Sequence, residues 1–161
     1  MTALWSALAI VAALLAQSGL SLLLPGAARL FDPFLLITVF VCLTRGENTG
    51  MLVGTAAAWA QELSFGVPPL GLLGLARVLV AFVVGQAGRR FLITNPFAQA
   101  ATVFATALVD VWLLARFAGM FEVSVVALPI TTVLGRATLN AVVGAIAFQL
   151  IERRLKREPA L

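Results

Sequence analysis

Long apolar runs separated by short polar or proline-rich breaks dominate the chain. Six of these runs predict membrane-spanning helices at approximately residues 3–24, 32–47, 50–65, 70–88, 97–117 and 128–151. Most are close to the roughly 20 apolar residues that a helix needs to cross the hydrocarbon core of a bilayer. The pattern therefore predicts an all-α integral membrane protein, a compact six-helix bundle that forms one transmembrane domain over residues 1–161.

Prolines and capping residues mark the breaks between the runs. Pro25 and Gly26 end the first run, and the sequence Gly66-Val67-Pro68-Pro69 forces a turn after the third. Asp32 followed by Pro33 predicts an N-cap and a first helical residue, because proline lacks the N–H that would have no partner there. The second run is short for a crossing, so we expect its helix to extend through Arg45 and Gly46.

The composition agrees with a lipid-facing surface. Hydrophobic residues make up 61% of the 161 positions, charged residues make up 11%, and the mean hydropathy is +1.06. A soluble domain carries about 25% charged residues. The first run lacks a basic segment before it, so we expect a retained span and not a removed signal peptide.

Most basic residues fall on one side of the predicted bundle. With the N-terminus inside, the inner side holds Arg45, Arg89 and Arg90 as well as a C-terminal cluster of Arg153, Arg154, Lys156 and Arg157. The positive-inside rule then places both termini in the cytoplasm. Because the cluster directly follows an apolar span, we interpret it as an anchor at anionic lipid and not as a nucleic-acid surface.

Candidate catalytic and metal-binding residues are scarce. The chain has one cysteine, Cys42, and no histidine, which excludes an internal disulfide, a His–Cys metal cluster and a His-based triad. Cys42 lies in an apolar run and is interpreted as a small core residue. No catalytic, metal or cofactor site is predicted, and the protein is not expected to be an enzyme.

Four charged residues fall inside the predicted spans: Glu62, Arg77, Asp110 and Arg136. All lie in the outer half of the bundle, and their charges sum to zero. A charge at the bilayer centre costs about 2.5–3.5 kcal/mol or more, so pairing within the bundle is expected. Two interpretations stay open, namely buried ion pairs that fix helix register, and a polar ligand site or proton path. The balanced signs and the absence of histidine favour ion pairs.

The same charges suggest a weak internal repeat. Arg77 and Arg136 each stand eight positions before the glycine of a Val-Val-Gly sequence, at Gly85 and Gly144. The preceding helix carries one acid in each case, Glu62 or Asp110. Duplication or structural equivalence of two helical hairpins is one explanation, and chance in a sequence rich in valine, glycine and alanine is the other.

Small residues recur at helical spacing in the first and third runs. Ala9 and Ala13 lie four positions apart, as do Gly50 and Gly54. Small-xxx-small patterns allow close approach of helices in lipid. They predict either internal packing or contact with the membrane helix of a partner.

Several of these features together resemble one family. They are Asp32-Pro33-Phe34-Leu35-Leu36, Leu43-Thr44-Arg45-Gly46, the glycines Gly50 and Gly54, the pair Gln61-Glu62, and the stretch from Pro68 to Arg77 followed by Gly85. Over residues 32–90 the chain resembles the rod shape-determining protein MreD, and its length and basic tail are similar as well.

The resemblance implies a non-enzymatic scaffold of the bacterial cytoplasmic (inner) membrane. Such proteins belong to the elongasome, the cell-shape machinery of lateral peptidoglycan synthesis, and bind the single-span protein MreC beside other elongasome membrane proteins. The resemblance leaves a homo-oligomer of the complex open. It also implies a fold similar to the substrate-binding subunits of energy-coupling-factor vitamin transporters. A substrate-binding subunit of such a transporter is therefore the alternative function, and it would require a roomy cavity in the outer half.

Overall fold

The computed structural model describes residues 2–66, 71–91, 95–124 and 128–157, and these segments contain helices and no strand. The helices are α1 (Thr2–Leu23), α2 (Pro25–Leu30), α3 (Pro33–Arg45), α4 (Glu47–Phe65), α5 (Leu72–Arg90), α6 (Pro96–Met120) and α7 (Ile130–Arg157). The predicted all-helical class is confirmed. The side chains described are those of residues 4–151 within these segments.

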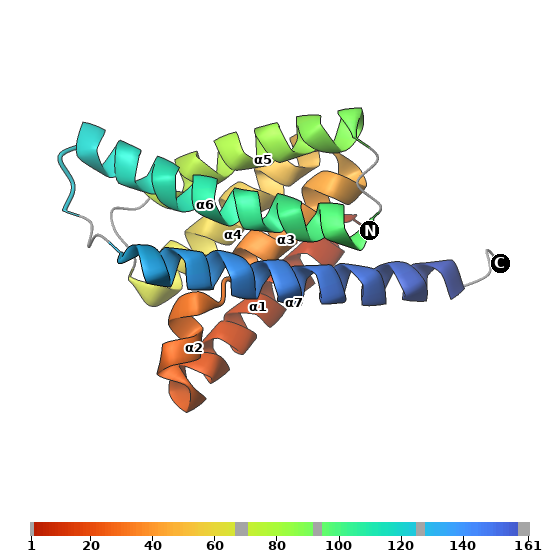
Figure 1. Ribbon diagram of the computed structural model, residues 1–161, viewed down its shortest axis with the longest axis horizontal. Helices are drawn as coiled ribbons and strands as arrows, with labels where there is room; N and C mark the ends of the chain where they lie inside the picture. The colour runs from red at the N-terminus through yellow and green to blue at the C-terminus, as the bar shows by residue number, and fades with distance from the viewer. Residues whose placement is uncertain (1, 67–70, 92–94, 125–127, 158–161) are drawn as a thin grey trace.

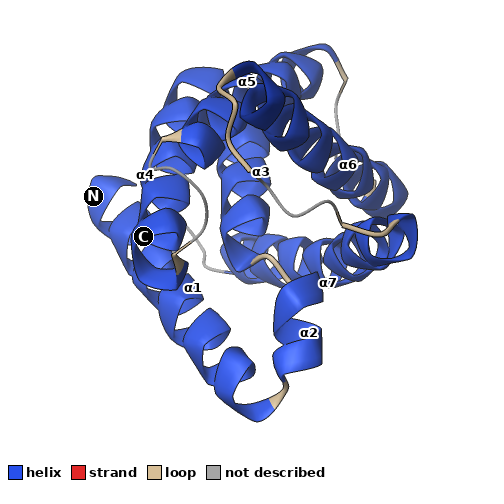
Figure 2. Ribbon diagram, turned by 90° about the vertical axis from the view of Figure 1, so that its left-hand side faces the viewer, coloured by secondary structure: helices blue, strands red, loops and turns tan. Residues whose placement is uncertain are grey.

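Helix α3 occupies the middle of the bundle. Hairpins α4–α5 and α6–α7 and the N-terminal helix α1 all pack against it, and Figure 2 shows it surrounded by its neighbours. The long helices lie roughly along one axis, and α1 begins at the same end of the bundle where α7 finishes (Figure 1). Helices α3 and α5 also end there. Because Arg45, Arg89 and Arg90 lie at these helix ends, we call this the basic end.

Five segments of the described chain are long and apolar enough to cross a membrane. They are Leu4–Leu23, Pro25–Arg45, Leu72–Arg90, Pro96–Met120 and Ile130–Ile151. Helix α4 has 19 residues but is not among them, because Glu47, Asn48, Gln61 and Glu62 make it more polar than the others. Several membrane-spanning helices are thus supported, and the count of six stays a prediction.

The second span differs from its predicted bounds. Helix α3 ends at Arg45 and α4 begins at Glu47, so the expected extension through Gly46 is wrong. Gly46 has a φ of +84°, which ends one helix and redirects the chain into the next. The missing length lies on the other side of Asp32, where Pro25 starts the short helix α2.

Other observed helix boundaries differ from the predicted ones by smaller amounts. Helix α4 begins three residues earlier than the predicted span 50–65, while α7 starts at Ile130 and continues past residue 151 to Arg157. The predicted start of the fourth span, Leu70, lies outside the described residues. The predicted cap at Asp32 is confirmed, because its side chain accepts a hydrogen bond from the Leu35 N–H and Pro33 is the first helical residue.

The small residues of α4 serve close internal packing. A Cβ added at Gly50 would overlap Cys42 Sγ of α3, and one at Gly54 would lie 2.8 Å from Thr38 Cγ2. Ala13 of α1 is buried against α3 and α4. Three of the four candidate small residues therefore hold the bundle together. The fourth, Ala9, lines an open groove that is described below.

Candidate functional site

The centre of the candidate site is Asp32, at the junction of α2 and α3. Its carboxylate is 1% exposed, and Oδ1 accepts a hydrogen bond from the Leu35 N–H at 3.0 Å. The Asp32 N–H donates to Asn140 Oδ1 of α7 at 2.9 Å. An Asp-Pro helix start thus places a carboxylate, capped and buried, between helices that are far apart in sequence.

Two arginines bind the free side of this carboxylate. Arg77 Nη2 lies 2.6 Å and Arg136 Nη2 lies 2.5 Å from the same oxygen, Asp32 Oδ2. Arg77 Nε lies 2.9 Å from Asp110 Oδ1 of α6. Arg77 is fully buried, whereas 19% of the Arg136 side chain is exposed. These two acids and two bases form a neutral network, which we call the charge cluster.

Two amide side chains extend the charge cluster. Asn140 Nδ2 donates to the carbonyls of Leu30 at 2.8 Å and Arg136 at 2.7 Å, so α7 is tied to the end of α2. Gln61 Oε1 of α4 accepts a longer hydrogen bond from Arg77 Nη2 at 3.4 Å. Asn140 was not predicted as a site residue, although its position four residues after Arg136 places both on one helix face.

The structure brings together three of the four intramembrane charges singled out in the sequence, Arg77, Asp110 and Arg136. Glu62 binds elsewhere. Its two carboxylate oxygens accept hydrogen bonds from the N–H groups of Gly71 and Leu73, each at 2.7 Å, at the start of α5. The positive end of the helix dipole favours a carboxylate at this position. Asp32, expected only as a helix cap, takes the place in the network that depth alone suggested for Glu62.

In the suggested repeat the two arginines occupy equivalent places in the structure, and the two acids do not. Arg77 of α5 and Arg136 of α7 approach α3 from two sides and meet at one oxygen. The glycines eight positions later also lie at close helix contacts, since a Cβ at Gly85 would overlap Glu47 and one at Gly144 would lie 2.9 Å from Leu36 Cδ2. Duplication itself stays a hypothesis.

The chemistry of the charge cluster is that of a buried network of ion pairs. Each guanidinium binds a carboxylate, and the acids bind arginine or backbone donors. One donor, Arg77 Nη1, is buried and has no hydrogen-bond partner among the described residues. Within the same residues no three His, Cys, Asp or Glu side chains gather as metal ligands would.

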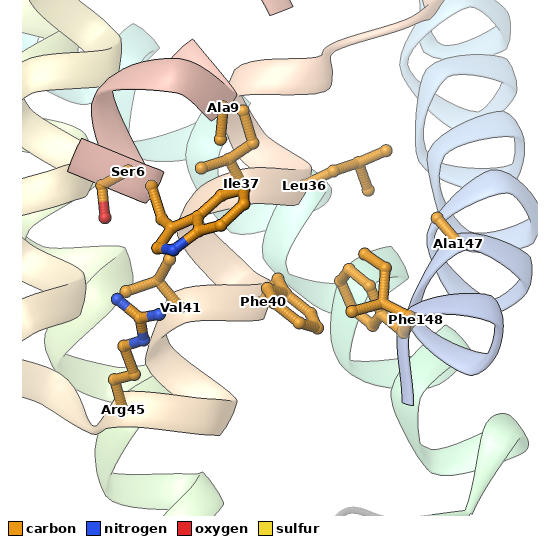
Figure 3. Close-up of a pocket in the computed structure, with 11 residues that line it drawn as sticks. Ser6, Ala9, Leu36, Ile37, Phe40, Val41, Arg45, Ala147 and Phe148 are labelled. Carbon is orange, nitrogen blue, oxygen red and sulfur yellow. The ribbon is translucent and has the colours of Figure 1, made fainter. Parts of the chain in front are cut away.

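A second feature is a groove near the basic end of the bundle. It encloses about 840 Å³ between α1, α3 and α7, and Figure 3 shows Phe40, Phe148, Ala147 and Arg45 around it. No Cα atom of α1 lies within 8 Å of one of α7 in the described chain, and α2 packs against both helices. The lining residues are Trp5, Ser6, Ala9, Leu36, Ile37, Phe40, Val41, Arg45, Ala147, Phe148 and Ile151. Almost all are apolar.

Further charges lie at the basic end. Glu47 at the start of α4 is buried, and its Oε1 lies 2.7 Å from Arg89 Nη2 of α5. The backbone of α7 continues as a helix through the predicted anchor residues Arg153, Arg154, Lys156 and Arg157, whose side chains lie outside those described. Cys42 is a free, buried thiol packed against Gly50, in agreement with a core position.

Comparison with protein-family models, with curated proteins and with solved structures finds no match to this chain.

Proposed function

We propose that this protein is a non-enzymatic scaffold of a bacterial cytoplasmic-membrane complex, of the kind to which the MreD-like motifs point. The observation that carries the proposal is the charge cluster, in which four intramembrane charges bind one another at 2.5–2.9 Å. A network of this kind fixes how helices pack, because breaking it would leave a buried charge unpaired. A bundle whose buried charges are paired suits a protein whose task is to hold others in place.

The proposed bundle has six spans, with α4 as the sixth. Helix α4 packs along α3 and α5, and its polar residues Glu47 and Glu62 are buried in protein contacts. A helix whose polar groups face neighbouring helices crosses a bilayer without meeting the full cost of exposing them to lipid. Six crossings return the chain to its starting side, so both termini lie at the basic end. The positive-inside rule assigns that end to the cytoplasm.

The proposed partner is the single transmembrane helix of an MreC-like protein, and α1 is its proposed docking element. Only 6% of the residues in the apolar window of α1 are buried, against 28% to 56% in the other four candidate spans. The uncovered face of α1 carries Ala12, Ala16 and Gly19, at the spacing that allows close helix approach. Two observations, little burial and small residues on the open face, thus favour α1 over the other helices.

The alternative function, a vitamin-binding transporter subunit, has weaker support. Such a subunit requires a roomy cavity in the outer half of the bundle. In this bundle Arg77 and Asp110, which would line such a cavity, bind each other and Asp32 instead. The groove that is present lies at the basic end and is lined almost entirely by apolar residues.

A cross-linking experiment tests the scaffold and its docking helix together. Cys42 is the only cysteine, so a Cys42→Ala background accepts single new cysteines. Ala16→Cys on α1 and Val109→Cys on the lipid-exposed face of α6 form a matched pair, since both positions are exposed. We expect the Ala16→Cys variant, labelled in membranes of its own host with a thiol-reactive photocrosslinker, to capture a single-span partner, and the Val109→Cys variant labelled in the same way to capture none.

Identification of the captured chains separates the two functions. A single-span protein with a periplasmic coiled coil, recovered with cell-wall synthases, supports the scaffold. Recovery of paired ATPases with a larger membrane subunit would overturn it in favour of the transporter. Equal cross-linking at positions 16 and 109 would remove α1 as the docking element.

A further inference from the structure

The groove between α1 and α7 has the length of one membrane leaflet. Along α3 its lining runs from Leu36 to Arg45, which corresponds to about 13 Å at 1.5 Å per residue. The hydrocarbon core of a bilayer is about 30 Å thick, so the groove covers roughly half of it. A membrane-spanning helix would need a docking surface about twice as long.

The groove also has a polar and an apolar end. Its floor and one wall are built by the rings of Phe40 and Phe148, whose centroids lie 5.2 Å apart. Leu36 and Ala9 line the part deeper in the bundle, and Arg45 lines the part at the basic end (Figure 3). An occupant that matches this lining is apolar over about 13 Å and anionic at one end.

The sequence that follows the groove is basic. Ile151 lines the groove, and residues 152–158 contain four bases and two acids directly after it in the sequence. With Arg45 the total is five bases against two acids, a net charge of +3. The helical backbone of α7 continues to Arg157, past the ends of the neighbouring helices, as Figure 1 shows. Basic residues beside a membrane attract anionic lipid by about 1 kcal/mol each.

We propose that the groove binds one anionic phospholipid from the leaflet at the basic end. One acyl chain lies along α3 between α1 and α7, against Phe40 and Phe148, and the headgroup phosphate lies at Arg45. The lipid fills the space between α1, α3 and α7. This inference does not depend on the proposed scaffold function, because the docking face on α1 carries Ala12 and Ala16, whereas the groove is lined by Ala9 and Trp5.

Tryptophan fluorescence provides a local probe of the groove. The chain has three tryptophans, and of these only Trp5 lines the groove. The variant Trp59→Phe/Trp112→Phe keeps Trp5 alone, and Trp5→Phe/Trp112→Phe keeps the lipid-exposed Trp59 of α4 as a matched control. Each purified variant is reconstituted in phosphatidylcholine vesicles with increasing fractions of chain-brominated phosphatidylglycerol or chain-brominated phosphatidylcholine.

We expect brominated phosphatidylglycerol to quench Trp5 with an apparent association about five- to tenfold stronger than that of brominated phosphatidylcholine. For Trp59 the two lipids should quench equally. Because each tryptophan is compared with itself, its depth in the bilayer does not affect the ratio. Equal quenching of Trp5 by both lipids overturns the proposal, as does protection of Trp5 from both, which would indicate a helix of a second chain in the groove.

Three substitutions in the Trp5-only background locate the binding. Ala147→Phe fills the groove and should reduce the preference for phosphatidylglycerol to near one. Ile146→Phe, next to it on the lipid-exposed face of α7, should leave the preference unchanged. Arg45→Gln should lower the preference severalfold without changing the quenching by phosphatidylcholine. An unchanged preference in the Ala147→Phe variant would place the lipid outside the groove and overturn the proposal.

Discussion

The two ends of α3 have opposite surroundings: polar contacts close one end, and an open apolar groove borders the other. At its N-terminal end Asp32 is buried, and its carboxylate oxygens bind two arginines and a backbone N–H. At its C-terminal end the side of α3 that carries Phe40 and Arg45 faces an apolar groove. The difference shows which surfaces of a membrane bundle need contacts with other helices. Charged groups require protein partners in lipid, whereas apolar surfaces are stable without them.

The two ends of α3 also differ in how strictly they fix the packing of the neighbouring helices. The polar end defines the register of α3, α5, α6 and α7, because each of these helices supplies a side chain to the charge cluster. The apolar end imposes no comparable geometry on α1 and α7, whose Cα atoms stay more than 8 Å apart within the described residues. Substitutions at the two ends should therefore differ strongly in their effect on stability.

Loss of the shared carboxylate should have the largest effect. Asp32→Ala leaves Arg77 and Arg136 without their common acceptor, and we expect a loss of about 3–5 kcal/mol in the free energy of unfolding. Asp32→Asn keeps an oxygen that can cap α3 but removes the charge, so it should lose most of that amount. Reversible unfolding in mixed detergent micelles measures both. An Asp32→Asn variant within about 0.5 kcal/mol of wild type would show that the carboxylate serves as a cap alone.

A double-mutant cycle measures whether Arg77 and Asp110 at the polar end contribute to stability as a pair. Arg77→Met leaves Asp110 unpaired, and Asp110→Leu leaves Arg77 with one acid fewer. The double variant keeps the neutral pair of Asp32 and Arg136. It should therefore be more stable than the sum of the single losses predicts, by about 1–3 kcal/mol. Additive losses would mean that the contact between Arg77 and Asp110 contributes nothing to the fold.

Helix contact on the closed side of α3 should have the next largest effect. Gly50→Ala places a Cβ on Cys42 Sγ, and overpacking of this kind costs about 1–3 kcal/mol. Removing the sulfur with Cys42→Ala in the same chain should recover most of the loss. Gly19→Ala on α1, where an added Cβ meets nothing within 4 Å, is the matched control and should be neutral. Equal stability of the Gly50→Ala and Gly19→Ala variants would contradict the close contact.

The smallest effect is expected inside the groove. Ala147→Phe adds a ring to open space and should change the free energy of unfolding by less than about 0.5 kcal/mol. Gly144→Ala, one turn earlier on α7, adds a single carbon 2.9 Å from Leu36 Cδ2 and 3.2 Å from Val103 Cγ2. It should cost about 1 kcal/mol. If the larger residue at position 147 were the more damaging one, the comparison between a closed and an open end would fail.

The amino-acid pattern predicted the helical class and most helix positions, since apolar runs and their breaks follow directly from what lipid requires. It failed where backbone geometry at a single residue decides the outcome. Gly46 ends α3 with a positive φ, and Pro25 starts α2, which no periodicity signals. The chain was therefore expected to gain its missing length after Arg45, and it gained it before Asp32.

The candidate site was predicted in part for a similar reason. Depth along each helix identifies which charges share a layer, and it selected Arg77, Asp110 and Arg136. Depth does not reveal which way a helix faces, so Glu62 was grouped with them although it caps α5. The pattern at Asp32 predicts a helix N-cap, and only the tertiary structure shows that this cap is buried among other helices. The groove has no sequence signal, because it arises from the spacing of three helices.

The hydrogen bond between Asp32 and Asn140 has a consequence for how the protein is made. The two residues are 108 positions apart, so at about 5–20 residues per second α7 is synthesised roughly 5 to 20 s after α3. During that interval the Asp32 carboxylate is in the membrane without Arg136, and the end of α2 is without its Asn140 contact. Helix α7, made well after α2 and α3, is thus the helix that fixes the junction between them. A chain truncated before α7 should be recognised by membrane proteases as unfinished, however well its earlier helices have inserted.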